Sequence, residues 1–374
     1  MGAVNSDRAL LILARARTPD ALLRVLLAAH PDPCVALDVA RGGAGLPLTP
    51  GTREALRRPD AARIDADLAW LQQPGHALLG WRDPDYPALL RQCPSPPPLL
   101  FLAGDASLLW HPQVAIVGSR KPSAGGRDRA RQFARALAAR GWVITSGMAE
   151  GIDTSAHEGA LATGRTIAVV GTGPDIAYPS TNAALRDRIV GEGLLVSEHP
   201  PGTEPLPSHF PSRNRILVGL ALGTVVVEAA LRSGALVSAR LAAEAGREVF
   251  ALPGSVDNPT SRGCHALIRQ GAALVEAPDE VLATLGPVAD SLATAVRNRL
   301  EIPSTESPVH SAGGQPEPDT DHNRLWSALG HDPTGMDALA ERTGLTVAAL
   351  SSMLLIMELE GRVIADHGRY ARRS

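Results

Sequence analysis

The sequence contains little cysteine and few aromatic residues. Its three cysteines, Cys34, Cys93 and Cys264, lie far apart and form no C-x-x-C pair, so neither a disulfide framework nor a zinc site is expected. Aromatic residues make up 3% of the chain, whereas hydrophobic residues make up 44%. Because alanine, leucine and valine dominate, this composition favours helices packed on a buried sheet over an aromatic-rich β-sandwich.

Long apolar runs and an excess of positive charge are also missing. No stretch is long enough to span a bilayer, and Arg15 and Arg17 interrupt the apolar segment near the N-terminus, which therefore does not resemble an export signal. We expect a cytoplasmic protein without a membrane partner. The formal net charge is -3, so any binding of nucleic acid must depend on a local cluster of cations.

The composition changes along the chain and predicts five segments. Residues 1–80 have leucine and alanine at helical spacing and predict a small helical domain. Residues 81–112 are rich in proline and predict an extended connector. Residues 113–288 alternate between strand and helix patterns. Residues 289–321 predict a flexible linker, and residues 322–374 have a winged-helix-like pattern of helices followed by a hairpin.

The central segment carries the main fold signal. Its six short apolar runs are continuous rather than alternating, which indicates strands buried on both faces of a parallel sheet. Alanine-rich amphipathic segments, such as residues 128–139 and 235–245, lie between them. We therefore expect an α/β fold with a doubly wound, Rossmann-like and mostly parallel sheet, flanked by an all-helical domain and a winged-helix domain.

Small residues follow several of these strands, at the edge where open parallel sheets bind their ligands. Glycine and serine allow backbone amides at helix N-termini to approach an oxyanion, and four such turns on one edge predict a phosphate-binding surface. One of these four turns follows the third strand and contains Gly171. The other three turns supply six candidate residues: Gly118, Ser119, Ser146, Gly147, Ser233 and Gly234.

Cations and one aromatic ring accompany these turns. Arginine side chains match the geometry of phosphates, and an aromatic ring offers a face for a base, so together they are typical of a site for single-stranded nucleic acid. The alternative is that Arg213 and Arg215 pair with acids such as Glu198 or Glu228, with Phe210 in the core; composition leaves both open. The candidates are Arg120, Lys121, Phe210, Arg213, Asn214 and Arg215.

Enzyme signatures are weak in comparison. The stretch from Gly171 to Ile176 fails the G-x-G-x-x-G pattern, and no P-loop motif occurs. His157 follows Asp153, a predicted helix N-cap, by one turn, and is expected to be packed rather than catalytic. Glu150 and Glu228 carry the chemistry of a general base but have no evident partner. We expect no catalytic residue, no metal and no cofactor.

The central motifs resemble the DNA-processing protein A family (DprA, also called Smf). They occur in the family's order and cover the whole central segment. The matching stretches are Gly118-Ser-Arg, Ser146-Gly-Met-Ala-Glu-Gly-Ile-Asp with Ala156-His157, Tyr178-Pro-Ser-Thr-Asn182, Ser197-Glu-His-Pro-Pro-Gly202, Phe210-Pro-Ser-Arg-Asn-Arg-Ile-Leu-Val-Gly219, Val227-Glu-Ala, Ser233-Gly-Ala-Leu, Gly246-Arg-Glu-Val-Phe-Ala-Leu-Pro-Gly254 and Leu267-Ile-Arg-Gln-Gly271.

The resemblance implies a non-enzymatic protein that binds single-stranded DNA and loads the RecA recombinase onto it, in natural transformation, recombination and possibly repair. It also implies a homodimer formed through the Rossmann-like domain, a sterile-alpha-motif-like (SAM-like) N-terminal domain and a C-terminal winged helix. The DNA-binding residues carried over from the family's motifs are Gly118, Ser119, Arg120, Phe210, Arg213, Asn214 and Arg215.

Two departures from the family's pattern stand out. The tyrosine usual after the first turn is missing around Ser123, which removes a stacking or packing group. Residues 322–374 contain six arginines and no lysine against six acids, so this segment is not basic, whereas a winged helix that reads duplex DNA usually needs an excess of cations. We expect this domain to be an auxiliary DNA module or a protein contact, with a simple capping domain as the alternative.

Two other functions compete with DNA binding. A nucleotide-processing hydrolase of the lysine-decarboxylase-like phosphoribohydrolase kind uses a similar sheet, but it requires a glycine run before its catalytic glutamate, and the stretch after Val227 has none. An interaction scaffold with a vestigial pocket would bind RecA but not DNA.

Overall fold

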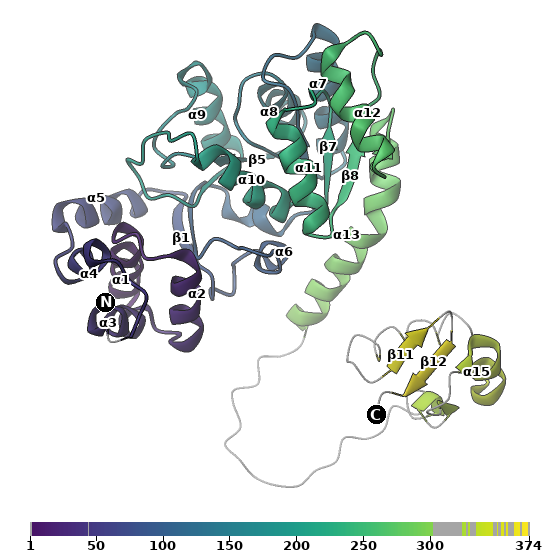
Figure 1. Cartoon of the computed structure of the whole chain (residues 1–374), viewed down its shortest axis with the longest axis horizontal. Coiled ribbons are helices and arrows are strands. Elements are labelled where there is room, and N and C mark those ends of the chain that lie inside the picture. The colour runs from purple at the N-terminus through teal and green to yellow at the C-terminus, as the bar shows by residue number, and fades with distance from the viewer. Residues whose placement is uncertain are drawn as a thin grey trace. The chain divides into compact units, whose positions relative to one another are not determined.

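The chain forms two compact units, Met1–Glu301 and Ile302–Ser374. The computed structural model describes residues 2–301 except 44, and in the second unit residues 324–326, 328–329, 334–346, 350, 353–354, 357, 363–366 and 369–372. Figure 1 shows both units, coloured by residue number from the N-terminus to the C-terminus. No helix within these described ranges is long and apolar enough to cross a membrane.

The first unit begins with the predicted helices. Asp32, Thr49 and Asp60 cap three of them by accepting hydrogen bonds from backbone amides. Pro19 occupies the N-cap position of the second helix, which starts at Asp20 without a side-chain cap. The helices are α1 (Gly2–Arg15), α2 (Asp20–Ala29), α3 (Pro33–Gly42), α4 (Pro50–Arg57) and α5 (Ala61–Leu71).

A nine-stranded sheet follows, in the order β1-β2-β6-β5-β4-β3-β7-β8-β9. The strands from β6 to β9 in this order are parallel, and β1 and β2 are antiparallel additions at one edge. This confirms the mostly parallel sheet. The strands are β1 (His76–Gly80), β2 (Leu99–Gly104), β3 (Gln113–Val117), β4 (Val143–Ser146), β5 (Thr166–Val170), β6 (Leu194–Ser197), β7 (Gly223–Val226), β8 (Glu248–Ala251) and β9 (Ala273–Leu274).

The antiparallel edge departs from the expected segment boundaries. Residues 76–80, expected in the helical domain, form β1, and residues 81–112, expected as an extended connector, contain α6 (Ala88–Arg91), β2 and η1 (Ala106–Trp110). The reason is burial: the run after the prolines is apolar, and its residues Leu99 to Ala103 are all buried. One hydrophobic cluster joins α1 to α5 with β2 and α9, so the helices and the sheet share a core.

Helices cover both faces of the sheet, as a doubly wound fold requires. One core cluster joins the sheet to α7, α8 and α13, and another joins it to α10, α11 and α12. In Figure 1, α10 and α11 lie on the face toward the viewer. The helices are α7 (Ala124–Ala138), α8 (Ile152–Leu161), η2 (Ser180–Asn182), α9 (Ala183–Glu192), α10 (His209–Leu220), α11 (Gly234–Glu244), η3 (Pro259–Ser261), α12 (Arg262–Arg269) and α13 (Pro278–Glu301).

The strand order places β3 at the switch point of the sheet. From β3 the chain passes through α7 to β4 on one side, and it returns later through α10 to β7 on the other. Connections that leave in opposite directions open a crevice beyond the carboxyl ends of the strands, where such folds bind ligands.

The expected linker begins later than residue 289. Helix α13 continues to Glu301, because residues 289–301 are dominated by helix-forming residues and the first proline of the linker is Pro303. Residues 302–321 lie outside the described residues.

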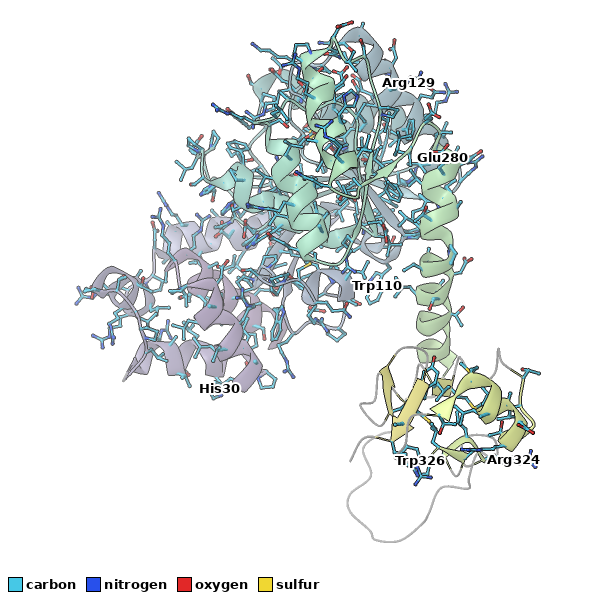
Figure 2. The ribbon with its side chains drawn as sticks, turned by 45° about the vertical axis from the view of Figure 1, so that its right-hand side comes forward. His30, Trp110, Arg129, Glu280, Arg324 and Trp326 are labelled. Carbon is cyan, nitrogen blue, oxygen red and sulfur yellow. The ribbon has the colours of Figure 1, made fainter. Side chains whose placement is uncertain are left out.

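The second unit contains the small sheet of a winged helix. Its strands have the order β10-β12-β11 and are antiparallel. The guanidinium of Arg372 lies over the ring of Trp326, which is labelled in Figure 2. The distance from Arg372 Cζ to the centroid of the Trp326 ring is 4.5 Å. The last helix that the winged-helix pattern implies before the hairpin lies largely outside the described residues. The described elements are β10 (Thr334–Gly335), α15 (Met336–Thr343), β11 (Val363–Asp366) and β12 (Arg369–Arg372).

Candidate nucleic-acid interface

A pocket of about 760 Å³ opens beyond the carboxyl end of β3; we call it the β3 pocket. Its walls come from the turns after β3, β4 and β7 and from α10. Nine of the twelve candidate residues line it: Gly118, Ser119, Arg120, Lys121, Phe210, Arg213, Asn214, Ser233 and Gly234. The remaining three, Ser146, Gly147 and Arg215, do not.

The turn after β3 is held tightly between two neighbours. The Ser119 amide donates to the Glu228 carbonyl at 2.6 Å, and the Ser119 carbonyl accepts from the Ile152 amide at 3.1 Å. A Cβ on Gly118 would lie 2.6 Å from the Ile152 side chain, so only glycine fits there. The turn is thereby fixed by β7 and by the start of α8, and it presents the next two residues outward.

Arg120 and Lys121 are the exposed cations of the β3 pocket. Neither side chain makes a hydrogen bond or an ion pair with any residue that the structure describes. An unpaired guanidinium and ammonium beside a cavity attract phosphate without first breaking a protein contact.

Phe210 forms an aromatic pair with Tyr178. The two ring centroids are 5.0 Å apart with an interplanar angle of 37°. Phe210 is half-buried on α10, whereas Tyr178 is 45% exposed and lines the pocket. Phe210 therefore supports a ring that solvent can reach, and the accessible stacking surface includes Tyr178.

Arg213 lies inside the protein and is not an open cation. It is 4% exposed, and its Nη1 donates hydrogen bonds to the carbonyls of Gly147 and Val169. Burial lowers the pKa of its guanidinium to about 10, against the opposing effect of Asp153. Arg213 remains charged at neutral pH and joins the turn after β4 to β5 from beneath the pocket.

The turn after β4 is used internally. The Ser146 hydroxyl is buried and donates to the Ile116 carbonyl at 2.7 Å. The Asp153 carboxylate accepts from the amides of Gly147 and Ala149, at 3.2 and 3.3 Å. Asp153 is thus the second residue of α8 and binds the preceding turn, while Gly151 occupies the N-cap position where Asp153 was expected. Amides engaged by a carboxylate are not available to a phosphate.

The turn after β7 leaves a helix end open to the pocket. Ser233 precedes α11 and makes no side-chain capping bond, and its hydroxyl has no partner among the described residues. A Cβ on Gly234 would meet nothing within 4 Å, so the approach to these amides is unobstructed. The positive end of the α11 dipole favours an anion here.

Arg215 lies on the opposite side of α10. Its Nη2 is 2.6 Å from Glu198 Oε2 and 3.5 Å from Asp20 Oδ2. The pairing with Glu198 is the alternative that composition left open. Within the described residues Arg213 forms no ion pair with Glu198 or Glu228; backbone carbonyls accept its hydrogen bonds, and Asp153 is the nearby acid.

The remaining titratable groups near the site are engaged in packing. His157 is fully buried, hydrogen-bonds through Nδ1 to the Thr166 hydroxyl at 2.7 Å, and burial lowers its pKa to about 3. Glu228 is 7% exposed and accepts from the amide and hydroxyl of Ser123 and from Asn258. With three donors, this carboxylate is poorly placed to act as a general base. The described residues contain no group of metal-binding side chains.

Sequence reasoning missed Tyr178 as a site residue. The ring enters from the loop after β5 and lines the β3 pocket. The available signal was its place at the start of the Tyr178–Asn182 motif, an exposed aromatic residue in a chain with few of them.

Comparisons with known proteins agree with this fold. The model of the DNA recombination-mediator protein A family matches residues 77–286, and that of the DprA winged helix domain matches residues 309–369. Protein Smf of Escherichia coli is 43% identical over 311 residues, which cover 83% of this chain and 80% of that protein.

Two solved structures are also similar. The X-ray structure of DNA processing protein A from Streptococcus pneumoniae aligns with a TM-score of 0.67 at 37% identity, covering 74% of this chain and 97% of that one. DNA processing protein A from Helicobacter pylori, studied for its single-stranded DNA binding mode, aligns with a TM-score of 0.51 at 31% identity, covering 56% of this chain and 95% of that one.

Proposed function

Because the chain belongs to the DNA recombination-mediator protein A family, we propose that it is a cytoplasmic, non-enzymatic protein that binds single-stranded DNA in the β3 pocket. The observation that carries the proposal is the joint presence of unpaired Arg120 and Lys121, the open N-terminus of α11 and the exposed Tyr178 ring in one cavity. Cations and helix amides attract phosphates, and the ring stacks a base. The Helicobacter pylori relative supports the same ligand.

The groups in the pocket define how binding would behave. Amides and guanidinium groups contact phosphates and carry no base information, so sequence preference is expected to be weak. Affinity is expected to fall with salt, since each phosphate contact with a single strand contributes about -0.7 to the slope of log K against log salt. A base can stack only when its face is free, which favours single strands over duplex.

Fluorescence anisotropy of a labelled oligonucleotide, single-stranded against duplex over a salt series, tests the proposal. We expect a clear preference for the single strand and a salt-dependent affinity. Absence of binding to either form at low salt would overturn the assignment and favour the interaction scaffold.

The aromatic pair allows a sharper test. Tyr178→Ala is expected to weaken single-strand binding by about 1–3 kcal/mol, roughly 5- to 150-fold, because one base stack is lost. Tyr178→Phe keeps the ring and is expected to bind nearly as wild type. Equal losses in both variants would show that the hydroxyl, rather than stacking, is responsible.

We further propose that the protein loads RecA onto the bound strand, in natural transformation, recombination and repair, with its N-terminal helices forming a SAM-like domain. On DNA coated with single-strand-binding protein, it is expected to shorten the lag before RecA hydrolyses ATP. An unchanged lag together with intact DNA binding would contradict RecA loading but not the proposed DNA binding.

The proposed assembly is a homodimer formed through the Rossmann-like domain. Two β3 pockets bridged by one strand would raise apparent affinity through effective concentration, without any new contact. Sedimentation velocity is expected to give the mass of two chains, and a monomer at all concentrations would contradict this assembly.

A further inference from the structure

A second pocket, of about 600 Å³, lies between the N-terminal helices and the sheet; we call it the interdomain pocket. Helix α10 separates it from the β3 pocket. Phe210 and Asn214 line the β3 pocket, whereas Ser212 and Arg215 line the interdomain pocket. The two cavities therefore share one helix as a wall. A nucleic-acid strand that passes from one cavity to the other would cross α10.

More arginines than carboxylates line the interdomain pocket. Four arginines, Arg15, Arg17, Arg63 and Arg215, face two carboxylates, Asp20 and Glu198. The β3 pocket has the same excess, with three cations against one carboxylate. His199 and His209 also line the interdomain pocket, and their rings stack with centroids 4.0 Å apart.

Two of the four arginines are available to a ligand. Arg17 is exposed, and its guanidinium makes no hydrogen bond or ion pair within the described part of the chain. The Arg63 side chain is 71% exposed, and its one ion pair, with Asp60 at 3.4 Å, is open to solvent. The other two are committed, Arg15 to Asp67 at 2.5 Å and Arg215 to Glu198.

The pocket also contains donors that lack acceptors. Thr18 is 6% exposed, yet its hydroxyl has no partner among the described residues. It precedes the N-terminus of α2, which begins after Pro19 without a side-chain cap. Buried polar groups are normally paired, so a hydroxyl and a helix end left open together point to an external acceptor. An anion satisfies both, because the helix N-terminus is its positive end.

The backbone at Arg17 agrees with this reading. Its φ is 53°, in the left-handed region that favours glycine and is unfavourable for other residues. A residue held in this conformation beside a cavity is consistent with a role for its side chain.

We infer that the interdomain pocket binds a second stretch of the same single strand, with Arg17 and Arg63 on phosphates and Thr18 with the α2 amides on a further phosphate oxygen. The stacked pair of His199 and His209 offers a base the kind of flat surface that single-stranded nucleic acid uses. The inference rests on the proposed function of the β3 pocket. It assigns the N-terminal helices a direct part in holding DNA.

The test compares the double variant Arg17→Glu/Arg63→Glu with Arg57→Glu/Arg58→Glu in the full-length protein, by anisotropy with oligo-dT of increasing length. The control changes the net charge equally, on exposed residues of the same helical region that do not line the pocket. On the shortest oligonucleotides that wild type binds, all three proteins are expected to agree. On long ones, the pocket variant is expected to bind at least 10-fold more weakly, with a salt slope smaller by about 1.4 for two lost phosphate contacts.

Four results would overturn the inference. An equal loss of affinity at every oligonucleotide length would show a general charge effect, and so would an equal loss in the control variant. No loss of affinity at any length would show that the pocket is not used. Thermal stabilisation of wild type, but not of the pocket variant, by free dTMP, without a length effect, would assign the pocket to a mononucleotide instead. Failure of the proposed function gives a different result, since wild type would then bind no oligonucleotide of any length.

Discussion

Replacing Arg213 by alanine is expected to lower the melting temperature of the protein more than any other change in the β3 pocket. The substitution leaves the buried carbonyls of Gly147 and Val169 without this donor and leaves Asp153 without its nearby cation. Loss of one partner from a buried charged arrangement costs about 3–5 kcal/mol. At about 2–4 °C per kcal/mol for a domain of this size class, the transition is expected to shift by roughly 6–20 °C in calorimetry.

Two variants make the stability result specific. Arg120→Ala changes an exposed arginine that has no partner among the described residues. Its free energy of unfolding is expected to lie within about 0.5 kcal/mol of the wild-type value. Adding Asp153→Asn to Arg213→Ala is expected to recover part of the loss, because the unpaired carboxylate is then replaced by a neutral amide. If Arg213→Ala instead kept the wild-type melting temperature and bound DNA more weakly, this result would contradict the structural role and indicate that Arg213 contacts the DNA.

The second large effect is expected from charge reversal at Arg120, with single-strand affinity falling by more than 10-fold while the fold is retained. A hydrogen bond to a charged group contributes about 1.5–3 kcal/mol, and glutamate adds repulsion of the neighbouring phosphates. The guanidinium has no protein partner to lose among the described residues, so the loss falls on binding and not on stability. Anisotropy over a salt series is also expected to show a shallower slope, as a phosphate contact disappears.

Arg129→Glu is the matched control for this variant. Arg129, labelled in Figure 2, is also exposed but lines a different cavity, beside Glu228. The reversal changes the net charge by the same amount without touching the β3 pocket, and wild-type affinity is expected. Equal weakening in both variants would mean that long-range charge, and not contact at the turn after β3, governs binding.

Some of the site followed directly from local sequence patterns. The Gly118-Ser119 turn could be placed because a continuous apolar run indicates a buried parallel strand, and the residues after such a strand lie at the ligand edge of the sheet. The start of α11 after Ser233 was found in the same way. The turn at Gly147 follows the same pattern, yet its amide is bound by Asp153, a contact that strand periodicity does not encode.

Side-chain orientation on α10 shows the limit most clearly. The motif Phe210-Pro-Ser-Arg-Asn-Arg reads as one cluster, but on a helix Arg213 and Arg215 point to different sides. Arg213 enters the interior to reach Gly147, 66 residues earlier in the chain, and Arg215 reaches Glu198 on the far side. Tyr178 likewise joins the site from another loop.

The sequence by itself determined the fold class, the family and the edge of the sheet that carries the candidate site, because periodicity and turn composition are properties of neighbouring residues. Only the tertiary structure decided which cations are open. Arg120 and Arg17 make no side-chain contact of this kind with the described residues, whereas Arg213 and Arg215 are held by partners from distant segments, which are set by how the helices pack on the sheet.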